Sequence, residues 1–251
     1  MTNIWAIADL HLSFGVKNKS MDLFGPKWLN HSEKIQKNWE ERISANDVVL
    51  IAGDISWAMS LEEAMADLDW LDRLPGKKVL IKGNHDFWWP SLAKLNSLHF
   101  SSLNFVYNNA CQLGDISVAG TRLWDTKEYN YNPFIQFVPL KEKSKKTEQE
   151  IEKMIKENEK IFNKELTRLE ISLSQLNPSA SLKIAMTHYP PIGAHLLNSQ
   201  ASSLIEKYGV TLCVFGHLHN IKEKLPLLKK GEVTYFLTAC DYLDFCPIKI
   251  G

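Results

Sequence analysis

The stretch KKVLIKGNHDFWW, residues Lys77 to Trp89, joins an apolar run to a group of polar side chains. A short run such as VLI is typical of a strand that is covered on both faces. Asn84, His85 and Asp86 follow after a glycine, where this strand should end. In open α/β sheets, ligands bind at the carboxyl ends of the strands. The stretch therefore indicates an α/β fold with a functional site at this edge of the sheet.

Four more apolar runs end in polar residues in the same way. They are IWAIADLH, DVVLIAGD, LKIAMTH and TLCVFGHLH, and they deliver Asp9, His11, Asp54, His188, His217 and His219. A single aspartate after a strand is usually a cap or turn residue, and a single histidine is more often structural than a ligand. However, five of the eight histidines occupy such positions together with two aspartates and an asparagine. This recurrence favours one shared site.

Helical patterns lie between these strands, as an α/β architecture requires. One helix is expected over residues 31–43. Another should begin after Ser60, which forms a capping-box pattern with Glu63, and should end before Pro75. The C-terminal run after Val233 predicts further strands, with a turn near residues 241–244.

A highly charged segment at about residues 141–177 differs from the rest of the chain. Thr147 and Glu150 can form a capping box, and the apolar residues fall on one helical face: Ile151, Ile155, Phe162, Leu166, Leu169, Leu173 and Leu176. We expect one long amphipathic helix, or two with a break, inserted into a single domain of residues 1–251. The helix packs one stripe onto the domain or binds a partner.

Composition restricts the class of protein. With 251 residues, 45% of them hydrophobic, the chain is long enough for a sizeable core. A formal net charge of zero removes the simplest indication of a nucleic-acid partner and leaves only a local basic patch as a way to bind one. The four cysteines form no CxxC pair, the N-terminus has no basic leader, and no apolar run is long enough to span a membrane. We expect a cytoplasmic protein with reduced cysteines.

The candidate ligands suit a pair of metal ions. Imidazole, carboxylate and amide groups without cysteine favour Mn²⁺, Fe or Zn²⁺. One catalytic ion takes about three protein ligands, so seven candidates indicate two ions that share a carboxylate. Asp54 is the natural bridge because it lies midway in the motif order. Gly53, Gly83 and Gly216 precede ligands and are expected to let the chain turn sharply.

The ordered motifs resemble those of the calcineurin-like metallophosphoesterases. They are D-x-H at 9–11, G-D at 53–54, G-N-H-D at 83–86, the later His188, and G-H-x-H at 216–219. The resemblance, to a small phosphohydrolase of bacterial type, implies a four-layer α/β/β/α sandwich of two mixed sheets. It also implies a binuclear centre.

By this resemblance each metal takes four ligands. The first takes Asp9, His11, Asp54 and His219, and the second takes Asp54, Asn84, His188 and His217. His85 is then a catalytic histidine that protonates the leaving oxygen or stabilises charge there. A hydroxide between the metals is expected to attack phosphorus in line, without a covalent intermediate.

One position departs from the family pattern. Some relatives carry a second acid three residues after the G-D aspartate, where it orients the catalytic histidine, and this chain has Trp57 there. Tryptophan only donates, so it cannot act as that carboxylate. Asp86 is a possible substitute, or it caps the following turn.

The motifs do not select the phosphate ester. The loop at residues 13–30 should hang over the site, and Trp57, Trp89 and Arg122 are candidates for contact with the substrate. The alternatives are a core ring for each tryptophan and an ion pair for Arg122, for example with Asp125. We expect hydrolysis of a small-molecule phosphomonoester or phosphodiester. A nuclease or DNA-repair phosphodiesterase, a UDP-lipid pyrophosphatase and a non-catalytic scaffold of the same fold remain open.

Overall fold

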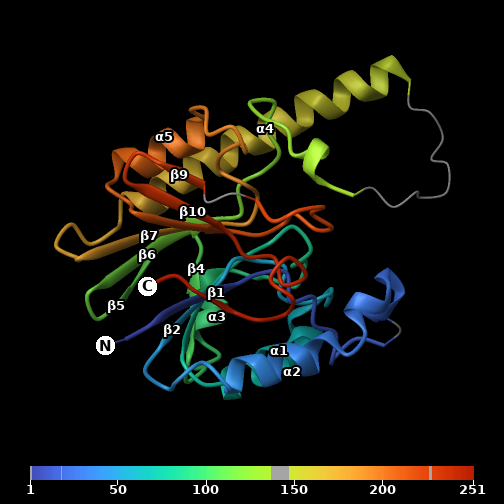
Figure 1. The fold of residues 1–251 in the computed structure, drawn as a ribbon, viewed down its shortest axis with the longest axis vertical. Coiled ribbons are helices and arrows are strands. Elements are labelled where there is room, and N and C mark those ends of the chain that lie inside the picture. Colours follow the sequence, from blue (N-terminus) through green and yellow to red (C-terminus); the bar gives the residue numbers. More distant parts are fainter. Residues whose placement is uncertain (1, 18, 137–146, 226–227) are drawn as a thin grey trace.

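Two sheets lie face to face, and helices cover both outer faces (Figure 1). The computed structural model describes residues 2–17, 19–136, 147–225 and 228–251. The predicted α/β/β/α sandwich of two mixed sheets is therefore confirmed. It follows from the sequence because helical segments lie between several of the apolar runs.

The first sheet has five strands in the order β11-β1-β2-β3-β4. Their bounds are Ile248–Lys249 for β11, Ile4–Ile7 for β1, Val48–Ile51 for β2, Lys77–Ile81 for β3 and Leu103–Val106 for β4. Strands β1 to β4 pair in parallel, and β11 runs antiparallel to β1 at the edge. All four parallel strands thus direct their carboxyl ends to the same side.

The second sheet has six strands in the order β5-β6-β7-β8-β10-β9. Their bounds are Ala110–Leu113 for β5, Ile116–Thr121 for β6, Leu182–Thr187 for β7, Leu212–Phe215 for β8, Val233–Leu237 for β10 and Leu228–Lys230 for β9. Strands β6, β7, β8 and β10 are parallel, and the edge strands β5 and β9 pair antiparallel.

The inner strands are largely apolar because both of their faces are covered. On β3, Val79 belongs to the cluster between the sheets, whereas its neighbour Leu80 belongs to the cluster beneath the helices of the first sheet. Side chains of a strand alternate between its two faces, so both faces need apolar residues here. Val118 and Met186 of the second sheet complete the layer between the sheets.

Helices α1 (His31–Glu40) and α2 (Leu61–Arg73) cover the first sheet, and α3 (Leu92–Asn96) lies beside β4. The Ser60 hydroxyl accepts the Glu63 amide, as predicted for the start of α2. The expected first helix ends at Glu40 instead of residue 43. The amides of Arg42 and Ile43 both donate to the Trp39 carbonyl, so the chain leaves the helix in a turn.

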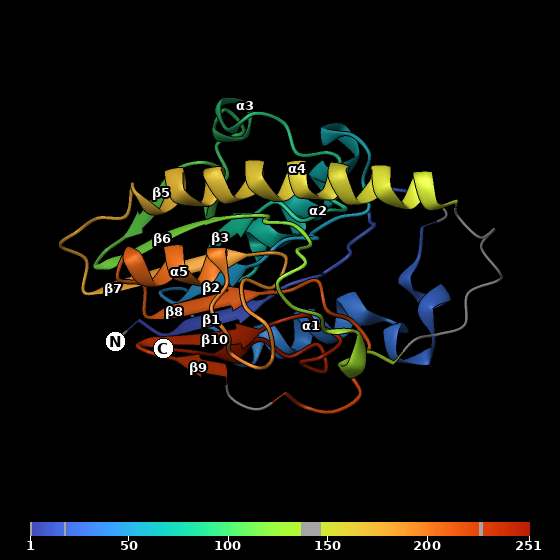
Figure 2. The ribbon, with the colours of Figure 1, turned by 90° about the horizontal axis from the view of Figure 1, so that it is seen from above.

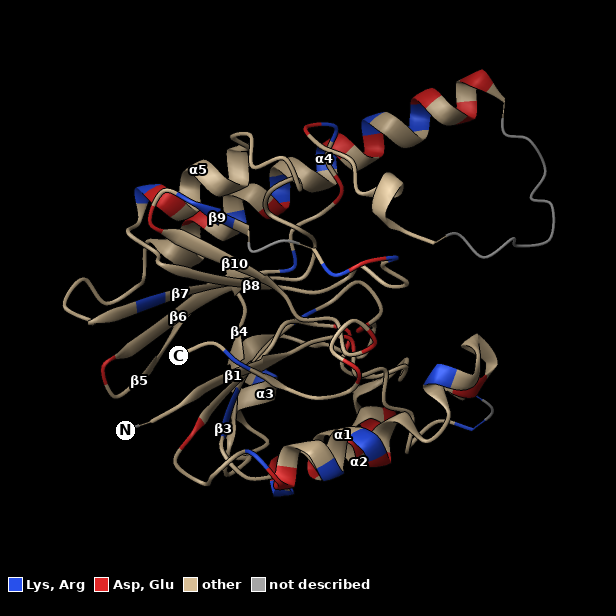
Figure 3. Ribbon diagram, viewed as in Figure 1, with Lys and Arg blue, Asp and Glu red and all other residues tan. Residues whose placement is uncertain are grey.

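Helices α4 (Glu148–Leu173) and α5 (Gln200–Lys207) cover the second sheet (Figure 2). Helix α4 is a single helix of 26 residues that begins at the predicted Thr147–Glu150 capping box. Its C-terminal half packs on the sheet, and its N-terminal half extends beyond it with acidic and basic residues interspersed (Figure 3). Residues 141–146 of the expected segment lie outside the described residues.

Short 3-10 helices complete the described structure at Met21–Phe24 (η1), Pro26–Trp28 (η2) and Asn132–Phe134 (η3). Among the helices that the structure describes, none is both long enough and apolar enough to cross a bilayer.

Candidate metal centre

The predicted ligands meet at the seam between the two sheets. Asp9, Asp54 and Asn84 follow β1, β2 and β3 of the first sheet, and His188 and His217 follow β7 and β8 of the second. Because the parallel strands of both sheets end on the same side, residues distant in sequence come within a few ångströms of one another. Each of the seven ligand candidates makes at least one contact under 3.5 Å with another member of the set.

One group of ligands surrounds His188. Its Nε2 atom lies 2.8 Å from Oδ1 of Asn84 and 3.4 Å from Oδ2 of Asp54. The Nδ1 atom of His217 lies 3.1 Å from the same Asn84 oxygen. These four side chains are the set that the family resemblance implies for the second metal.

A second group surrounds His219. The Nε2 atoms of His11 and His219 lie 3.3 Å apart, and His219 Nε2 is 3.6 Å from Oδ1 of Asp9. The Nε2 atom of His11 is 3.9 Å from Oδ2 of Asp54. These are the four residues implied for the first metal.

Both carboxylates lie between the two groups. Asp54 is near both His188 and His11, and Asp9 is near His219 while its Oδ1 atom is 4.0 Å from Nδ1 of His188. Asp9 joins His11 and His219 in one set of compatible ligand atoms and joins Asp54 and His188 in another. Either aspartate is therefore placed to serve both positions.

The hydrogen bonds of the histidines show that this donor set fits metal ions. His188 Nδ1 donates to the Ala52 carbonyl at 2.9 Å, which leaves Nε2 with a lone pair in the neutral ring. His219 Nδ1 faces the Asp241 carboxylate at 2.8 Å, so its Nε2 likewise presents a lone pair. These lone pairs face carboxylate oxygens and another imidazole nitrogen. A metal ion between such groups would satisfy these lone pairs and the facing carboxylates together.

Asp241 is a further candidate functional residue, outside the sequence motifs. Its Oδ1 atom accepts from His219, and its Oδ2 atom accepts the Asn220 amide at 3.0 Å. A carboxylate behind a ligating histidine orients the ring and makes it more basic. The sequence did contain a signal, because Asp241 follows the apolar run VTYFLTAC just as Asp9 and Asp54 follow theirs.

Glycines at the strand ends are required by close packing as well as by backbone conformation. Gly53 has a φ of +92°, in agreement with a sharp turn. Gly83 and Gly216 have no positive φ, but a Cβ at Gly83 would lie 2.1 Å from Oδ1 of Asp54. A Cβ at Gly216 would lie 2.4 Å from Oδ2 of Asp9. These two glycines therefore leave room for the ligand carboxylates, which is a different reason from the predicted turn.

Several candidate ligands adopt left-handed backbone conformations themselves. Asp9, His11, Asp54 and His217 have φ values of 59°, 46°, 53° and 69°. Such conformations are unfavourable for residues with a side chain and cluster at functional sites. The surrounding hydrogen bonds hold them, among them the Asp54 carbonyl accepting the His11 amide at 3.0 Å.

Burial and neighbouring charges shift the pKa values of this centre in opposite directions. Burial raises the pKa of Asp9 to about 7, against the effect of His219 and His188. Burial also disfavours the charged form of Asp54, but His188 and His11 outweigh it and hold that pKa well below its usual range. Without metal, protons therefore provide part of the positive charge that the two carboxylates require.

The imidazoles respond to the same charges. Burial lowers the pKa of His188 and of His219, but the aspartates raise both to about 9. Burial prevails at His11 and His217 and lowers their pKa values well below the usual range. Metal ions that bound here would displace the protons of His188 and His219.

His85 lies at the edge of the ligand cluster. Its amide donates to Oδ1 of Asp54 at 2.8 Å, and its ring is 5.7 Å from that of His11. The Trp57 ring lies 4.6 Å from His85 and stacks on His11 at 5.0 Å. Trp57 thus contacts His85 through its ring, at the sequence position where some relatives carry a carboxylate.

Asp86 has structural partners. Its oxygens accept the amides of Ile55, Ser56 and Gly83 and the indole N–H of Trp88, at 2.7 to 3.1 Å. Its carboxylate thereby ties the loop after β2 to the loop after β3. These contacts favour the capping alternative over the orientation of His85.

The side chains of two substrate-contact candidates make their contacts outside the ligand set, although the Arg122 carbonyl accepts the His188 amide at 3.1 Å. The Trp89 ring is buried against Trp88 and Phe105, in the core position that was the alternative for each tryptophan. Arg122 pairs with Glu165 of α4 at 3.2 Å and stacks on Trp124. Its ionic partner is thus Glu165, whereas the alternative considered from the sequence was Asp125.

The loop at residues 13–30 lies against the site, as expected from the sequence. Trp28 is buried and makes edge-on ring contacts with His11 and His219. Phe24 lies parallel to Trp57 with a centroid distance of 6.4 Å, and the Trp57 indole donates to the Met21 sulfur. The loop therefore forms one wall beside His11 and His85.

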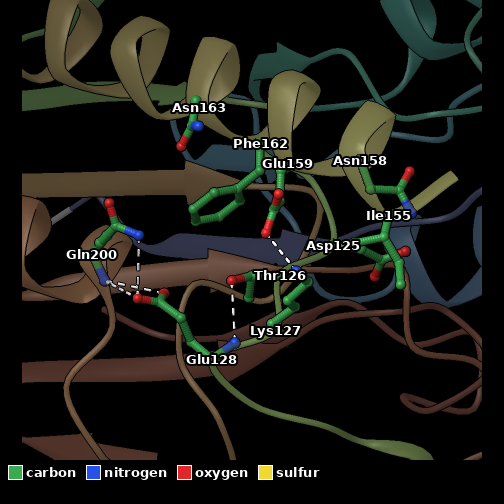
Figure 4. A pocket seen from close by; sticks show the side chains of 10 residues that line it. All are labelled: Asp125, Thr126, Lys127, Glu128, Ile155, Asn158, Glu159, Phe162, Asn163 and Gln200. Carbon is green, nitrogen blue, oxygen red and sulfur yellow. Dashed lines mark hydrogen bonds and ion pairs between the residues drawn. The ribbon is translucent and has the colours of Figure 1, made fainter. Parts of the chain in front are cut away.

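A separate groove of about 310 Å³ lies between α4 and residues 125–128 (Figure 4). Phe162 lies at its apolar side, Lys127 pairs with Glu159 across it, and Glu128 accepts the Gln200 amide at the start of α5. It contains none of the ligand candidates and is distinct from the metal centre.

The model of the calcineurin-like phosphoesterase family matches residues 2–220, and the chain belongs to this family. It is similar to the Gene 66 proteins of Mycobacterium phages D29 and L5. The first is 34% identical over 109 residues, covering 42% of this chain and 53% of that protein. The second is 33% identical over 90 residues, covering 34% and 41%. The chain spans about half the length of these curated relatives.

Among solved structures, the chain is similar to the phosphopantetheinyl hydrolase PptH from Mycobacterium tuberculosis. The TM-score is 0.53 with 15% sequence identity, over 99% of this chain and 95% of that one. At this identity the likeness shows a shared fold. The family and the Asp/His groups together support a metal-dependent phosphoester hydrolase as the general class of activity.

Proposed function

We propose that this protein is a binuclear metal-dependent phosphoesterase that hydrolyses a phosphomonoester or phosphodiester of a small molecule. The observation that carries this proposal is the convergence of imidazole lone pairs on two buried carboxylates at the seam between the sheets. Such a donor set has little structural use without cations, because buried carboxylates and lone pairs that face one another are costly.

The first ion would be held by Asp9, His11, Asp54 and His219, and the second by Asp54, Asn84, His188 and His217. Mixed imidazole and oxygen ligands favour Mn²⁺, with Fe or Zn²⁺ as alternatives. When bound, two such ions supply an acidified water as the nucleophile and Lewis-acid stabilisation of the phosphoryl oxygens. The chain itself fixes the geometry through Ala52, Asp241 and the left-handed ligand residues.

His85 would act on the leaving group. Its backbone is fixed by the bond to Asp54, and its ring packs against Trp57 at the edge of the ligand cluster. An imidazole in this position can deliver a proton to the leaving oxygen, or stabilise negative charge there. Trp57 then keeps the ring in place without a carboxylate behind it.

Arg122 remains our candidate for a contact with the substrate phosphate, although its present partners are Glu165 and Trp124. A row of ring contacts leads from Arg122 to His217. The guanidinium lies over Trp124, the Trp124 and Tyr189 centroids are 4.9 Å apart, and those of Tyr189 and His217 are 3.9 Å apart. Within the described residues the buried Nε atom of Arg122 has no hydrogen-bond partner. Glu165 also binds Arg168, so its charge is shared between two guanidinium groups.

We place the activity in the cytoplasm and assign it no nucleic-acid partner. All four cysteines are free, as is usual in a reducing compartment. The net charge of zero gives no general attraction to a polyanion.

The proposal is tested by loading the purified protein with Mn²⁺, Fe or Zn²⁺ and assaying a substrate panel. The panel contains aryl phosphomonoesters, bis-aryl phosphodiesters, cyclic nucleotides, a UDP-linked lipid, single-stranded DNA and a phosphopantetheinyl ester, the last because of the name of the M. tuberculosis neighbour. We expect metal-dependent hydrolysis of a small mono- or diester and loss of that activity with a chelator. Preference for DNA or for the UDP-lipid would replace our substrate class. No hydrolysis by protein with two bound metals would support the scaffold alternative.

A further inference from the structure

Exposed apolar side chains gather on the side of the centre where His85 lies. Phe24 is 65% exposed and Phe87 is 59% exposed. Leu23, next to Phe24 in the chain, and Met59, two residues after Trp57, are exposed as well. Single exposed apolar residues are normal on a protein surface, but a group of them marks a binding surface. This group flanks a candidate catalytic residue.

Ring contacts connect these residues to His85. The ring centroids of Phe87 and His85 lie 6.5 Å apart, at an interplanar angle of 80°. Trp57 also contacts His85, at a centroid distance of 4.6 Å. Phe24 extends the row, because it is parallel to Trp57 within 4°. We call Phe24, Trp57 and Phe87 the aromatic rim.

The rim is held in position by the loop after the first metal motif. The indole N–H of Trp57 donates to the Met21 sulfur at 3.1 Å, and Lys19 donates to the Trp57 carbonyl at 3.0 Å. Trp57 is also stacked on the candidate ligand His11. The position of the rim is therefore tied to that of the metal centre.

We propose that the aromatic rim binds the leaving group of the substrate, and that this group is planar and apolar, such as an aryl or heteroaryl alcohol. The proposal rests on the function proposed above, because His85 would meet the leaving oxygen and the rim lies beside His85. Flat rings prefer stacked or edge-on contacts with a flat partner, and the exposed rings of Phe24 and Phe87, beside Trp57, offer such a surface.

The test compares 2-naphthyl phosphate with phenyl phosphate in the metal-loaded enzyme. The two leaving groups are similar in acidity, so a difference in kcat/KM reports mainly on the extra ring. Burial of roughly 50 Å² more apolar surface corresponds to about a tenfold preference for the naphthyl ester. We expect Phe24→Ala and Phe87→Ala each to reduce this preference severalfold, and Phe24→Leu to restore only part of it because leucine is apolar but not flat.

A binding measurement separates this proposal from the proposed function. Dissociation constants of 2-naphthol and phenol, measured by NMR titration of the protein, do not depend on hydrolysis. Binding of 2-naphthol that Phe24→Ala weakens, in a protein that cleaves no phosphate ester, would sustain the rim and refute the phosphoesterase. Hydrolysis of both esters with equal kcat/KM, unchanged by Phe24→Ala, would sustain the phosphoesterase and refute the rim.

The matched control is Ile171→Ala, which removes an exposed apolar side chain from α4 on the outer side of the second sheet. It should leave the naphthyl preference unchanged. Co-sedimentation with phosphatidylcholine vesicles tests another occupant of the surface. Vesicle binding that depends on Phe24, without any naphthyl preference, would overturn the assignment to a leaving group.

Discussion

The Nε2 atom of His188 and the Oδ2 atom of Asp54 lie 3.4 Å apart, although one residue follows β7 of the second sheet and the other follows β2 of the first. The Ala52 carbonyl holds the proton of His188 on Nδ1, so the other nitrogen is turned toward the carboxylate. A single cation at this point would therefore join the two sheets.

Asp54→Asn should lower the affinity for both ions, because one carboxylate charge serves two cations. Metal analysis after dialysis against Mn²⁺ should find fewer than two equivalents in the variant. Asp69→Asn, an exposed position on α2, is the control and should keep two. Two equivalents with unchanged affinity in Asp54→Asn would show that Asp54 does not bridge, and would direct attention to Asp9.

His85→Asn should keep both metals and lose about 10²–10⁴-fold in turnover, the usual contribution of a positioned acid. The loss should be smaller for an ester with a nitrophenolate leaving group, which needs little protonation. Metal content and steady-state rates are measured on the same preparation. His99→Asn provides the control, since His99 is exposed and its left-handed backbone suits asparagine. If metal is lost with His85, the residue is a ligand.

Asp241→Asn should weaken binding of the ion beside His219, because the carboxylate at 2.8 Å orients that ring. The expected loss of metal affinity is about 10–100-fold, as for other partners of ligating histidines. A competition titration with a chromophoric chelator measures it. Asp244→Asn changes an exposed acid three residues further on and should have no effect. Equal affinities for wild type and Asp241→Asn would make the His219 contact dispensable.

Arg122→Ala should reduce kcat/KM for a phosphomonoester by about tenfold and for a diester by less, because the dianion leaves more charge to be neutralised. Arg122→Lys should recover only part of this, since an ammonium cannot form paired hydrogen bonds. Arg168 would still neutralise Glu165 in both variants, so metal content should not change. Equal losses for both ester types would return Arg122 to a purely structural role.

The burial of Lys78 should make the free energy of unfolding depend on pH. Its side chain is fully buried on β3, and burial lowers its pKa to about 8 although Asp72 acts in the opposite direction. The unfolded value is about 10.4. Between these two pH values the unfolded chain binds more protons, so the free energy of unfolding rises with pH in this window.

Denaturant titrations at a series of pH values measure this effect. The stability of wild type relative to Lys78→Met should rise by on the order of 2 kcal/mol between about pH 8 and pH 10.4. Lys77→Met, at the exposed neighbouring position, should follow the wild type. A constant difference between wild type and Lys78→Met across the window would mean that the buried ammonium keeps an ordinary pKa.

The strands and the ligand cluster could be predicted from the sequence because both depend on local patterns. Runs such as VLI at 79–81 need apolar residues on both faces, and a polar residue directly after the run identifies the end of the strand. The partner of Arg122 could not be predicted, since Glu165 lies 43 residues away on a helix whose rotation is set by packing. The different environments of Trp57 and Trp89 could not be predicted either, because both residues follow strand ends in the sequence. Only the structure shows that Trp57 contacts His85 whereas Trp89 lies in the core.

The sequence also predicted which residues lie at the site better than it predicted the structural role of each one. The glycines of the motifs were expected at turns, yet Gly83 and Gly216 are needed because carboxylate oxygens lie where a Cβ would be. Asp241 shows the converse. Its sequence context matched that of the other ligands, but only the fold reveals that it supports His219 from behind.

The order of the ligands along the chain has a consequence for biosynthesis. Asp9 emerges from the ribosome early, but its partner His219 follows 210 residues later and is the last of the seven. At synthesis rates of about 5–20 residues per second, strands β1 to β4 are synthesised on the order of ten seconds before the residues that complete the candidate centre. During that interval the nascent chain carries Asp9 and Asp54 without His188, His217 and His219. Binding of metal by the full set of candidate ligands would therefore be a late event, after most of both sheets has been synthesised.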